Sequence, residues 1–189
     1  MEMNVQKGGR NMASRKIKNI YARGADDGLW MGLYLTLVFG VTVMSLNVGV
    51  LNLVALVLMA GVPFMAFYFL RRTHKATYGM TLLSALWMQG IVMFACASLI
   101  FGLLSFIYLR WIDPDFFVRV LTLGIEYYSR IEAEGADAVA DELRMILDGG
   151  ALPNASTIVM VWMWLTMFGG AVLSLVLSVI VKAVGVKRV

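Results

Sequence analysis

The sequence predicts an all-α integral membrane protein. Four transmembrane helices are expected to form a bundle, with an extracytoplasmic amphipathic helical segment between the third and the fourth. The chain of 189 residues is 60% hydrophobic and only 15% charged, whereas a typical soluble domain is about 45–50% apolar and about 25% charged. Its apolar residues gather in four long runs, and its charged residues lie between the runs in blocks of opposite sign.

The four apolar runs are each long enough to cross a bilayer, which takes about 20 residues of helix. None of them contains Lys, Arg, Asp, Glu or His. The first two runs must be separated by a turn near Asn47 and Gly49, because one helix over both would be about twice as long as the hydrocarbon core. The predicted spans cover residues 28–46, 48–70, 78–109 and 156–181.

The charged blocks predict the orientation. Residues 110–155 hold four of the 16 cations and nine of the 12 acids, and the other cations lie in residues 1–27, 71–75 and 182–189. Lys and Arg accumulate in cytoplasmic segments. We therefore expect a four-helix membrane domain, residues 28–181, between two basic cytoplasmic tails, with the acidic segment outside. His74 is expected in a solvated cytoplasmic loop.

Small residues at four-residue spacing predict close helix–helix contacts in the first and fourth spans. Residues i and i+4 lie on one helix face, where small side chains let two backbones approach closely. The two ridges could pack on each other, and the alternative is a chance pattern of common membrane residues. The ridge residues are Gly28, Gly32, Thr36 and Gly40 in the first span, and Thr166, Gly170, Ser174 and Ser178 in the fourth.

Gln89 is the most polar group deep in the third span. An amide without a partner is costly in hydrocarbon, so its side chain should face the bundle interior and find a hydrogen-bond partner. A structural role is the simpler interpretation, and a place on a substrate path is the alternative.

The acidic segment, residues 110–155, predicts two amphipathic helices. Asp113 followed by Pro114 is typical of an N-cap and a first helical residue, and Asp115–Arg119 and Glu126–Arg130 have the i,i+4 spacing of ion pairs. One apolar face of this first helix is a candidate partner face. That face consists of Phe117, Leu121, Ile125 and Tyr128.

A break at Gly135 is expected to lead into a second helix over residues 136–147. The two helices are too short to bury a core by themselves, so their apolar faces need a cover. The candidates are the outer bilayer surface, the outer ends of the protein's own spans and a partner protein. An anionic bilayer would repel the acidic polar face.

No catalytic, cofactor or metal site is predicted. Asp137 and Asp141 share a helix face, but no His, Cys or Gly-rich calcium loop accompanies them. Asp26 and Asp27 are a close carboxylate pair before the first span. N-capping of that span is the simpler interpretation, and a role in a lipid-active enzyme is the alternative.

One stretch carries a family resemblance. “ATYGMTLLSALWMQG” leads into an apolar run that ends “YLRWIDPDF”, and two acidic helices and a last span follow. Over residues 24–184 the chain resembles a four-span inner-membrane family of unknown function, widespread in one Gram-negative phylum. The resemblance implies the bacterial inner membrane and supplies no catalytic residues. Members are often encoded near a polyprenyl-phosphate glycosyltransferase, which the resemblance offers as a partner system.

These features predict a non-enzymatic accessory or scaffold subunit for another membrane protein. The alternative is a small transporter or channel for a neutral or lipid substrate. The expected partners are the lipid bilayer and either a membrane protein or further copies of this chain. The net charge of +4 is no sign of nucleic-acid binding, because the basic residues lie in the segments that flank the spans, where they can contact anionic lipids.

Overall fold

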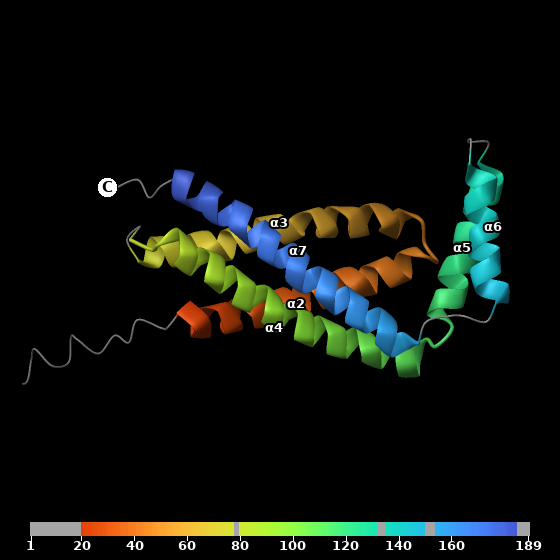
Figure 1. Ribbon diagram of the computed structural model, residues 1–189, viewed down its shortest axis with the longest axis horizontal. Coiled ribbons are helices and arrows are strands. Elements are labelled where there is room, and N and C mark those ends of the chain that lie inside the picture. The colour runs from red at the N-terminus through yellow and green to blue at the C-terminus, as the bar shows by residue number, and fades with distance from the viewer. Residues whose placement is uncertain (1–19, 78–79, 132–134, 150–153, 185–189) are drawn as a thin grey trace, which may run out of the picture.

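The computed structural model describes residues 20–77, 80–131, 135–149 and 154–184, and these residues form helices and no strand (Figure 1). The all-α prediction is therefore confirmed. In chain order, the helices are α2 (Ile20–Ser45), α3 (Val50–Ala76), α4 (Leu83–Ile107) with a π-helical extension η1 (Tyr108–Ile112), α5 (Phe116–Arg130), α6 (Ala136–Asp148) and α7 (Ala155–Val184).

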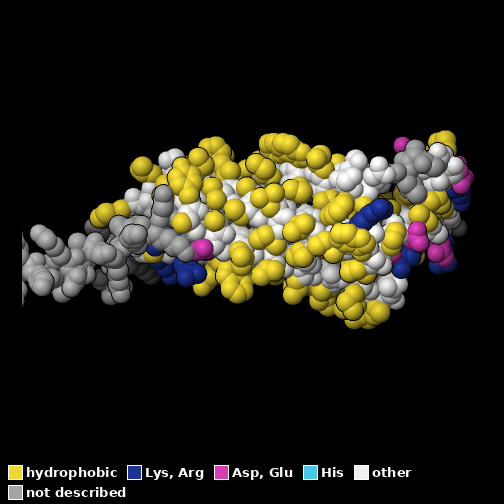
Figure 2. All heavy atoms as spheres, turned by 90° about the horizontal axis from the view of Figure 1, so that it is seen from below, with side chains coloured by type: hydrophobic (Ala, Val, Ile, Leu, Met, Phe, Trp, Pro, Cys, Tyr) yellow, Lys and Arg dark blue, Asp and Glu magenta, His cyan; other side chains and the backbone are white. Residues whose placement is uncertain are grey.

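Four of these helices, α2, α3, α4 with η1, and α7, are long and apolar enough to cross a membrane. They alternate in direction, so α2 begins and α7 ends at the same end of the bundle, where α3 also passes into α4 (Figure 1). We name this the terminus end. The opposite end, which carries α5 and α6, is the hairpin end. Charged side chains gather near the two ends, whereas the surface between them is largely apolar, as a membrane span requires (Figure 2).

The turn between the first two spans lies where the sequence predicts it, since α2 ends at Ser45 and α3 begins at Val50. The other end of α3 differs from the prediction. The helix continues through Arg71, Arg72 and Lys75 to Ala76, so the expected loop is helical. Basic side chains favour the C-terminal turn of a helix, where the backbone dipole is negative.

His74 lies in that last turn of α3 and is buried, so its prediction as a solvated loop residue is wrong. The side chain is enclosed because the last turn of α3 stays packed on the bundle, as the burial of its neighbour Thr73 also shows. Hydropathy ended the second span at residue 70. Tertiary contacts extend the buried helix beyond that point.

The helix α4 lies at the centre of the packing. On α2, a Cβ atom added at Gly28 would lie 2.7 Å from both the Met93 carbonyl oxygen and the Cys96 Cβ atom, so the two backbones are in close contact there. On α7, Gly170 meets Phe94 of α4, and the next ridge residue, Ser174, meets Gly90. The two ridges therefore do not face each other, because each of them packs on α4.

Gly40, expected on the α2 ridge, is exposed and has no neighbour within 4 Å of an added Cβ atom. Its expected place in the interface is wrong for a geometric reason. With 3.6 residues per turn, each four-residue step rotates the position by about 40°. Three steps from Gly28 turn Gly40 about 120° away from the α4 contact.

An aromatic cluster joins the α5–α6 hairpin to the bundle. Phe116, in the first turn of α5, is buried beside Phe39 and Tyr108, and Phe117 packs near Trp162. Beyond this turn the hairpin lies across the axis of the bundle (Figure 1), and α5 and α6 pack mainly on each other. The hairpin is thus anchored at its base.

The start of α5 differs from the prediction by two residues. The N-cap residue is Asp115, and Asp113 instead accepts hydrogen bonds from Tyr108 at 3.3 Å and from Arg119. The expected Asp115–Arg119 pair is therefore replaced by Asp113–Arg119. The Glu126–Arg130 pair forms as predicted. Gly135 also ends the connection as predicted, at φ = 88°, a left-handed conformation that suits glycine.

Candidate functional site

The most polar part of the interior lies near the terminus end, where α2, α3 and α4 meet. Gly24 makes this meeting close, since an added Cβ atom would lie 2.9 Å from the Gln89 carbonyl oxygen and 3.0 Å from the Val92 Cβ atom. One turn farther on, Gly28 packs on α4 in the same way. The approach brings the side chain of Asp27, between these two glycines, within reach of Gln89.

Gln89 is 0% exposed, and its amide Nε2 atom donates both of its hydrogen bonds across helices. One goes to Asp27 Oδ2 at 2.9 Å, and the other goes to Thr73 Oγ1 at 2.8 Å. The two acceptors lie on α2 and α3, so one amide on α4 connects three helices. Asp27 and Thr73 are themselves buried.

Among the residues that the structure describes, two buried polar atoms near this cluster have no hydrogen-bond partner, Gln89 Oε1 and His74 Nδ1. The amide orientation agrees with the chemistry of its neighbours. A flipped amide would place its oxygen against the Asp27 carboxylate, and two acceptors would then face each other. The unpaired oxygen is therefore a cost of connecting Gln89 to Asp27 and Thr73, since a buried unpaired polar atom costs about 1–3 kcal/mol.

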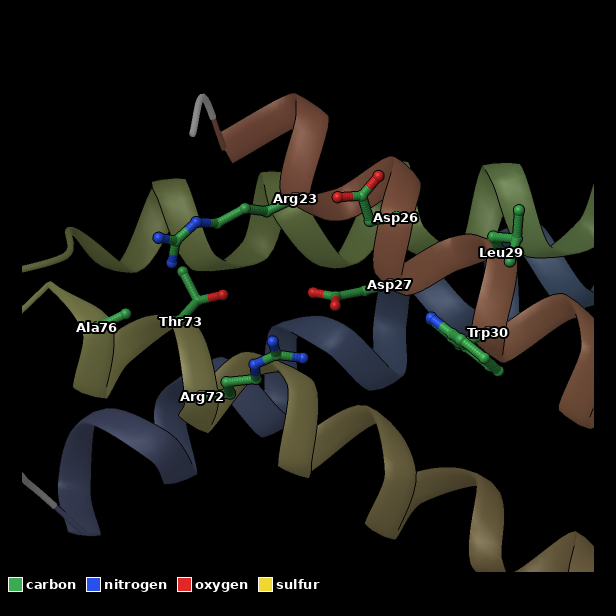
Figure 3. Close-up of a pocket in the computed structure, with 8 residues that line it drawn as sticks. All are labelled: Arg23, Asp26, Asp27, Leu29, Trp30, Arg72, Thr73 and Ala76. Atoms are coloured by element: carbon green, nitrogen blue, oxygen red, sulfur yellow. The ribbon is translucent and has the colours of Figure 1, made fainter. Parts of the chain in front are cut away.

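A cavity of about 490 Å³ opens beside the cluster (Figure 3). In Figure 3, the Asp27 carboxylate points toward Thr73, the Arg23 and Arg72 side chains approach this space from α2 and α3, and Asp26 points away from it. Its lining residues are Arg23, Asp26, Asp27, Leu29, Trp30, Arg72, Thr73 and Ala76.

The lining combines two guanidinium groups, two carboxylates and a buried hydroxyl with an apolar side formed by Leu29 and Trp30. Guanidinium groups bind planar or tetrahedral oxyanions through paired N–H donors. Among the residues that the structure describes, no three His, Cys, Asp or Glu side chains gather as they would to hold a metal ion. The lining suits recognition of a charged group.

The sequence singled out three of these residues, with different outcomes. Gln89 faces the interior and has hydrogen-bond partners. Asp26 and Asp27 do not cap α2, because this helix begins at Ile20 and both lie beyond its first turn. Hydropathy placed the first span at residue 28, but the helix continues beyond the apolar run toward the chain terminus. The first span therefore begins earlier than predicted and contains an ionisable residue, Asp27, which is buried inside the bundle.

Arg23, Arg72 and Thr73 were not predicted from the sequence as members of one site. Their distance from the helix ends could have indicated the site, because its residues lie at similar distances from the terminus end. Asp27 lies seven residues after the start of α2, and Gln89 lies six residues after the start of α4, which runs in the same direction. Thr73 lies three residues before the end of α3. Each lies within about two helical turns of the terminus end.

A comparison with protein families matches residues 26–183 to DUF4199, a family described as a protein of unknown function. The chain belongs to this family. The matched region contains Asp27, Thr73 and Gln89, whereas Arg23 precedes it. No curated protein and no solved structure matches the chain.

The predicted partner face of this DUF4199 member lies on α5 at the hairpin end. Phe117, Leu121 and Ile125 are half-buried, and Tyr128 is exposed. Phe117 belongs to the aromatic cluster at the base, and Gly124, near the centre of α5, faces Leu143 of α6. Much of the predicted face is therefore covered within the protein itself, and the exposed apolar residues lie elsewhere on the hairpin.

Proposed function

We propose that this DUF4199 protein is a non-enzymatic accessory subunit of the bacterial inner membrane, which binds another membrane protein through the α5–α6 hairpin. The hairpin carries the proposal because it extends beyond its anchor with large apolar side chains in the open. Tyr127 is 63% exposed and Met145 is 68% exposed, although α5 and α6 pack on each other. Tyr127 packs on Tyr128, which is 37% exposed, and adjoining exposed apolar side chains on a segment outside the spans are typical of an interaction surface.

The charge of the hairpin supports a protein partner over the bilayer surface. Residues 110–155 contain nine acids and four arginines, a formal net charge of −5. Three of the arginines are already held by Asp113, Glu126 and Asp141. An anionic bilayer repels such a segment. A partner with a basic surface around an apolar groove is complementary to it.

The orientation supports a partner surface on the outer side of the membrane. The terminus end carries the basic ends of α2, α3 and α7, and the positive-inside rule assigns such an end to the cytoplasm. The hairpin would then project into the extracytoplasmic space. A polyprenyl-phosphate glycosyltransferase system is the partner that the family resemblance offers.

The test is site-specific photo-crosslinking in native membranes. A photo-reactive amino acid at Tyr127 or Met145 should crosslink to one discrete membrane protein, whereas the same probe at Trp111, which is also exposed at this end but lies outside the hairpin, should not. Changing Tyr127 and Met145 to Ser should remove that protein from a mild-detergent pull-down. Both positions are exposed, so the variant should fold normally.

Two outcomes would refute the accessory function. Crosslinks only to lipid would mean that the apolar residues rest on the bilayer. Crosslinks only to a second copy of this chain would mean that the hairpin is a homo-oligomer interface.

A small transporter is the second candidate because of one observation, the buried carboxyl of Asp27. An ionisable side chain inside a helical membrane bundle commonly marks a transport path. Liposomes that contain the purified protein alone would test this function by the transbilayer movement of a fluorescent lipid analogue. Movement that is lost in Asp27→Asn would support transport, and no movement above empty liposomes would exclude transport of that lipid class.

A further inference from the structure

A second, apolar groove opens on the surface of the bundle between α4 and α7, which lie side by side toward the hairpin end (Figure 1). Its volume is about 290 Å³. We infer that this groove binds one acyl chain of a glycerophospholipid whose phosphate is held by Arg110, at the hairpin end of the same span. The groove is lined by Ala95, Ser98 and Leu99 of α4 and by Met160, Met163, Trp164 and Met167 of α7.

The chemistry of the lining suits a hydrocarbon chain. Apart from the indole nitrogen of Trp164, its only polar side-chain group is the hydroxyl of Ser98. That hydroxyl already donates a hydrogen bond to the Ala95 carbonyl oxygen at 2.8 Å. Trp164 forms a firm wall, because its ring is stacked on Phe168 with the ring centroids 5.0 Å apart. The three methionines can adjust to the shape of an occupant, since their side chains are unbranched and flexible.

The size of the groove favours a single chain over a helix of another protein. One turn of helix with its side chains is about 5.4 Å long and about 10–12 Å wide, so it fills about 400–600 Å³. The groove, at about 290 Å³, is smaller than one such turn. A lipid chain needs less width and is already present at this depth of a membrane.

Arg110 lies at the depth where a phospholipid carries its phosphate. It is exposed on η1, which continues α4 beyond the groove. Arg110 follows Leu99 by 11 residues, which is about 16 Å along a helix, and half of the hydrocarbon core is about 15 Å thick. The exposed ring of Trp111, beside it, is typical of the membrane interface. An acyl chain that crosses its own leaflet from Arg110 therefore reaches the groove.

One face of α4 and η1 connects the groove to Arg110. Leu99, Leu103, Phe106 and Arg110 follow one another at spacings of four, three and four residues, which places them on the same side of the helix. Leu99 and Leu103 are exposed, and Phe106 is half-buried. A chain attached to a phosphate at Arg110 can lie along this apolar face.

The guanidinium group of Arg110 is available to an anion. The other three arginines of residues 110–155 each form a salt bridge with a carboxylate, whereas Arg110 forms none among the residues that the structure describes. Guanidinium groups bind phosphate through paired N–H donors. The phosphate is common to all glycerophospholipids, so it is the phosphate and the chain, rather than one headgroup, that define the ligand.

The experiment uses the purified full-length protein in maltoside micelles, which contain no phosphate. A phosphatidylglycerol with a photo-reactive diazirine in one acyl chain is added at increasing concentration, and the labelled peptides are identified by mass spectrometry. Labelling of residues 160–167 should saturate, whereas labelling of the exposed residues 50–60 of α3 should rise in proportion to the lipid. A diacylglycerol with the same chain should label the groove about fivefold less or lower still, because it has no phosphate for Arg110.

Matched variants test the two ends of the site separately. Arg110→Gln should lower groove labelling by the phospholipid about fivefold or more, to the level of the diacylglycerol. Arg130→Gln removes the same charge from the hairpin but not from the proposed site, and should change labelling less than about twofold. Ala95→Phe should block the groove, whereas Ala60→Phe, the same change at an exposed position of α3, should leave groove labelling intact.

Three results would overturn the site. Groove labelling that rises in proportion to the lipid, as on α3, would mean ordinary solvation of the bundle by lipid. Equal labelling in Arg110→Gln and Arg130→Gln would remove the phosphate contact. A dimer of this chain that Ala95→Phe dissociates, without groove labelling, would assign the groove to a second copy.

The melting temperature of each variant shows whether it is folded, and Arg110→Lys provides a second variant that keeps the charge and should lose less labelling than Arg110→Gln. Failure of this site would leave the accessory function untouched. That function depends on the hairpin, and the probe at Trp111, next to Arg110, is expected to contact no protein.

Discussion

The contact between α2 and α4 predicts opposite effects for one substitution at two glycines of the same helix. In Gly28→Ala, the new Cβ atom would lie 2.7 Å from the Met93 carbonyl oxygen, a backbone atom that cannot rotate away. Overpacking of this kind costs about 1–3 kcal/mol, because the helices must separate. In Gly40→Ala the new atom meets nothing within 4 Å. This change should be neutral or should stabilise by about 0.5–1 kcal/mol, the advantage of Ala over Gly in a helix.

The assay is reversible unfolding of the purified protein in mixed micelles, with each variant compared with the wild type. The two free energies of unfolding should differ by about 1–3 kcal/mol, the cost of overpacking alone, with Gly28→Ala the less stable. The pair controls for helix propensity, since both changes are Gly to Ala on α2. If Gly28→Ala were as stable as Gly40→Ala, the close packing of α2 on α4 would be refuted.

Three further predictions concern the interior, the hairpin and the orientation. Gln89→Leu should lower the free energy of unfolding by about 1–3 kcal/mol, because the Asp27 carboxylate loses a buried hydrogen-bond donor. The same unfolding assay measures this change, and a variant as stable as the wild type would contradict the role of Gln89. Phe116→Ala should weaken the packing of the hairpin on the bundle by about 3–5 kcal/mol. Limited proteolysis should then cut α5 and α6 faster while the bundle stays intact, and an unchanged cleavage rate would count against the aromatic anchor. After the native cysteine is replaced, a membrane-impermeant thiol reagent added to spheroplasts should label Glu142→Cys but not Lys75→Cys, and the reverse result would invert the orientation.

Hydropathy was enough to predict the helices that could span a membrane, because the apolar composition of a segment does not depend on its neighbours in the fold. A run of about 20 apolar residues can satisfy its backbone in lipid only as a helix or a closed barrel. The turn near Asn47 follows from length alone. The break at Gly135 follows from the backbone freedom of glycine. None of these inferences needs to know which helix lies beside which.

The packing partners depend on more than one segment, and there the sequence was ambiguous. The ridge of Gly28 and Gly32 shows that a helix approaches closely, but not which helix approaches. The same holds for Gly170 and Ser174. Both ridges could have been assigned to α4 from its own composition, since α4 is apolar on all faces and a helix of that kind belongs at the centre of a bundle. In the structure, α4 with η1 is the most buried of the four spans.

The helix ends gave the largest errors, and they gave the candidate site. Hydropathy stops a span at its first charged residue, whereas Asp27 and His74 lie inside helices that continue beyond that point. Tertiary contacts stabilise these extra turns, and single-segment patterns do not contain such contacts. Within the described part of the chain, Gln89 Oε1 and His74 Nδ1 are buried there without hydrogen-bond partners. Buried polar atoms are usually hydrogen-bonded, so each exception has a structural cause. For Gln89 Oε1 the cause is the orientation of the amide, whose nitrogen binds Asp27 and Thr73. The terminus end is therefore where the structure departs most from its local rules, and the pocket bordered by Arg23 and Arg72 opens at that place.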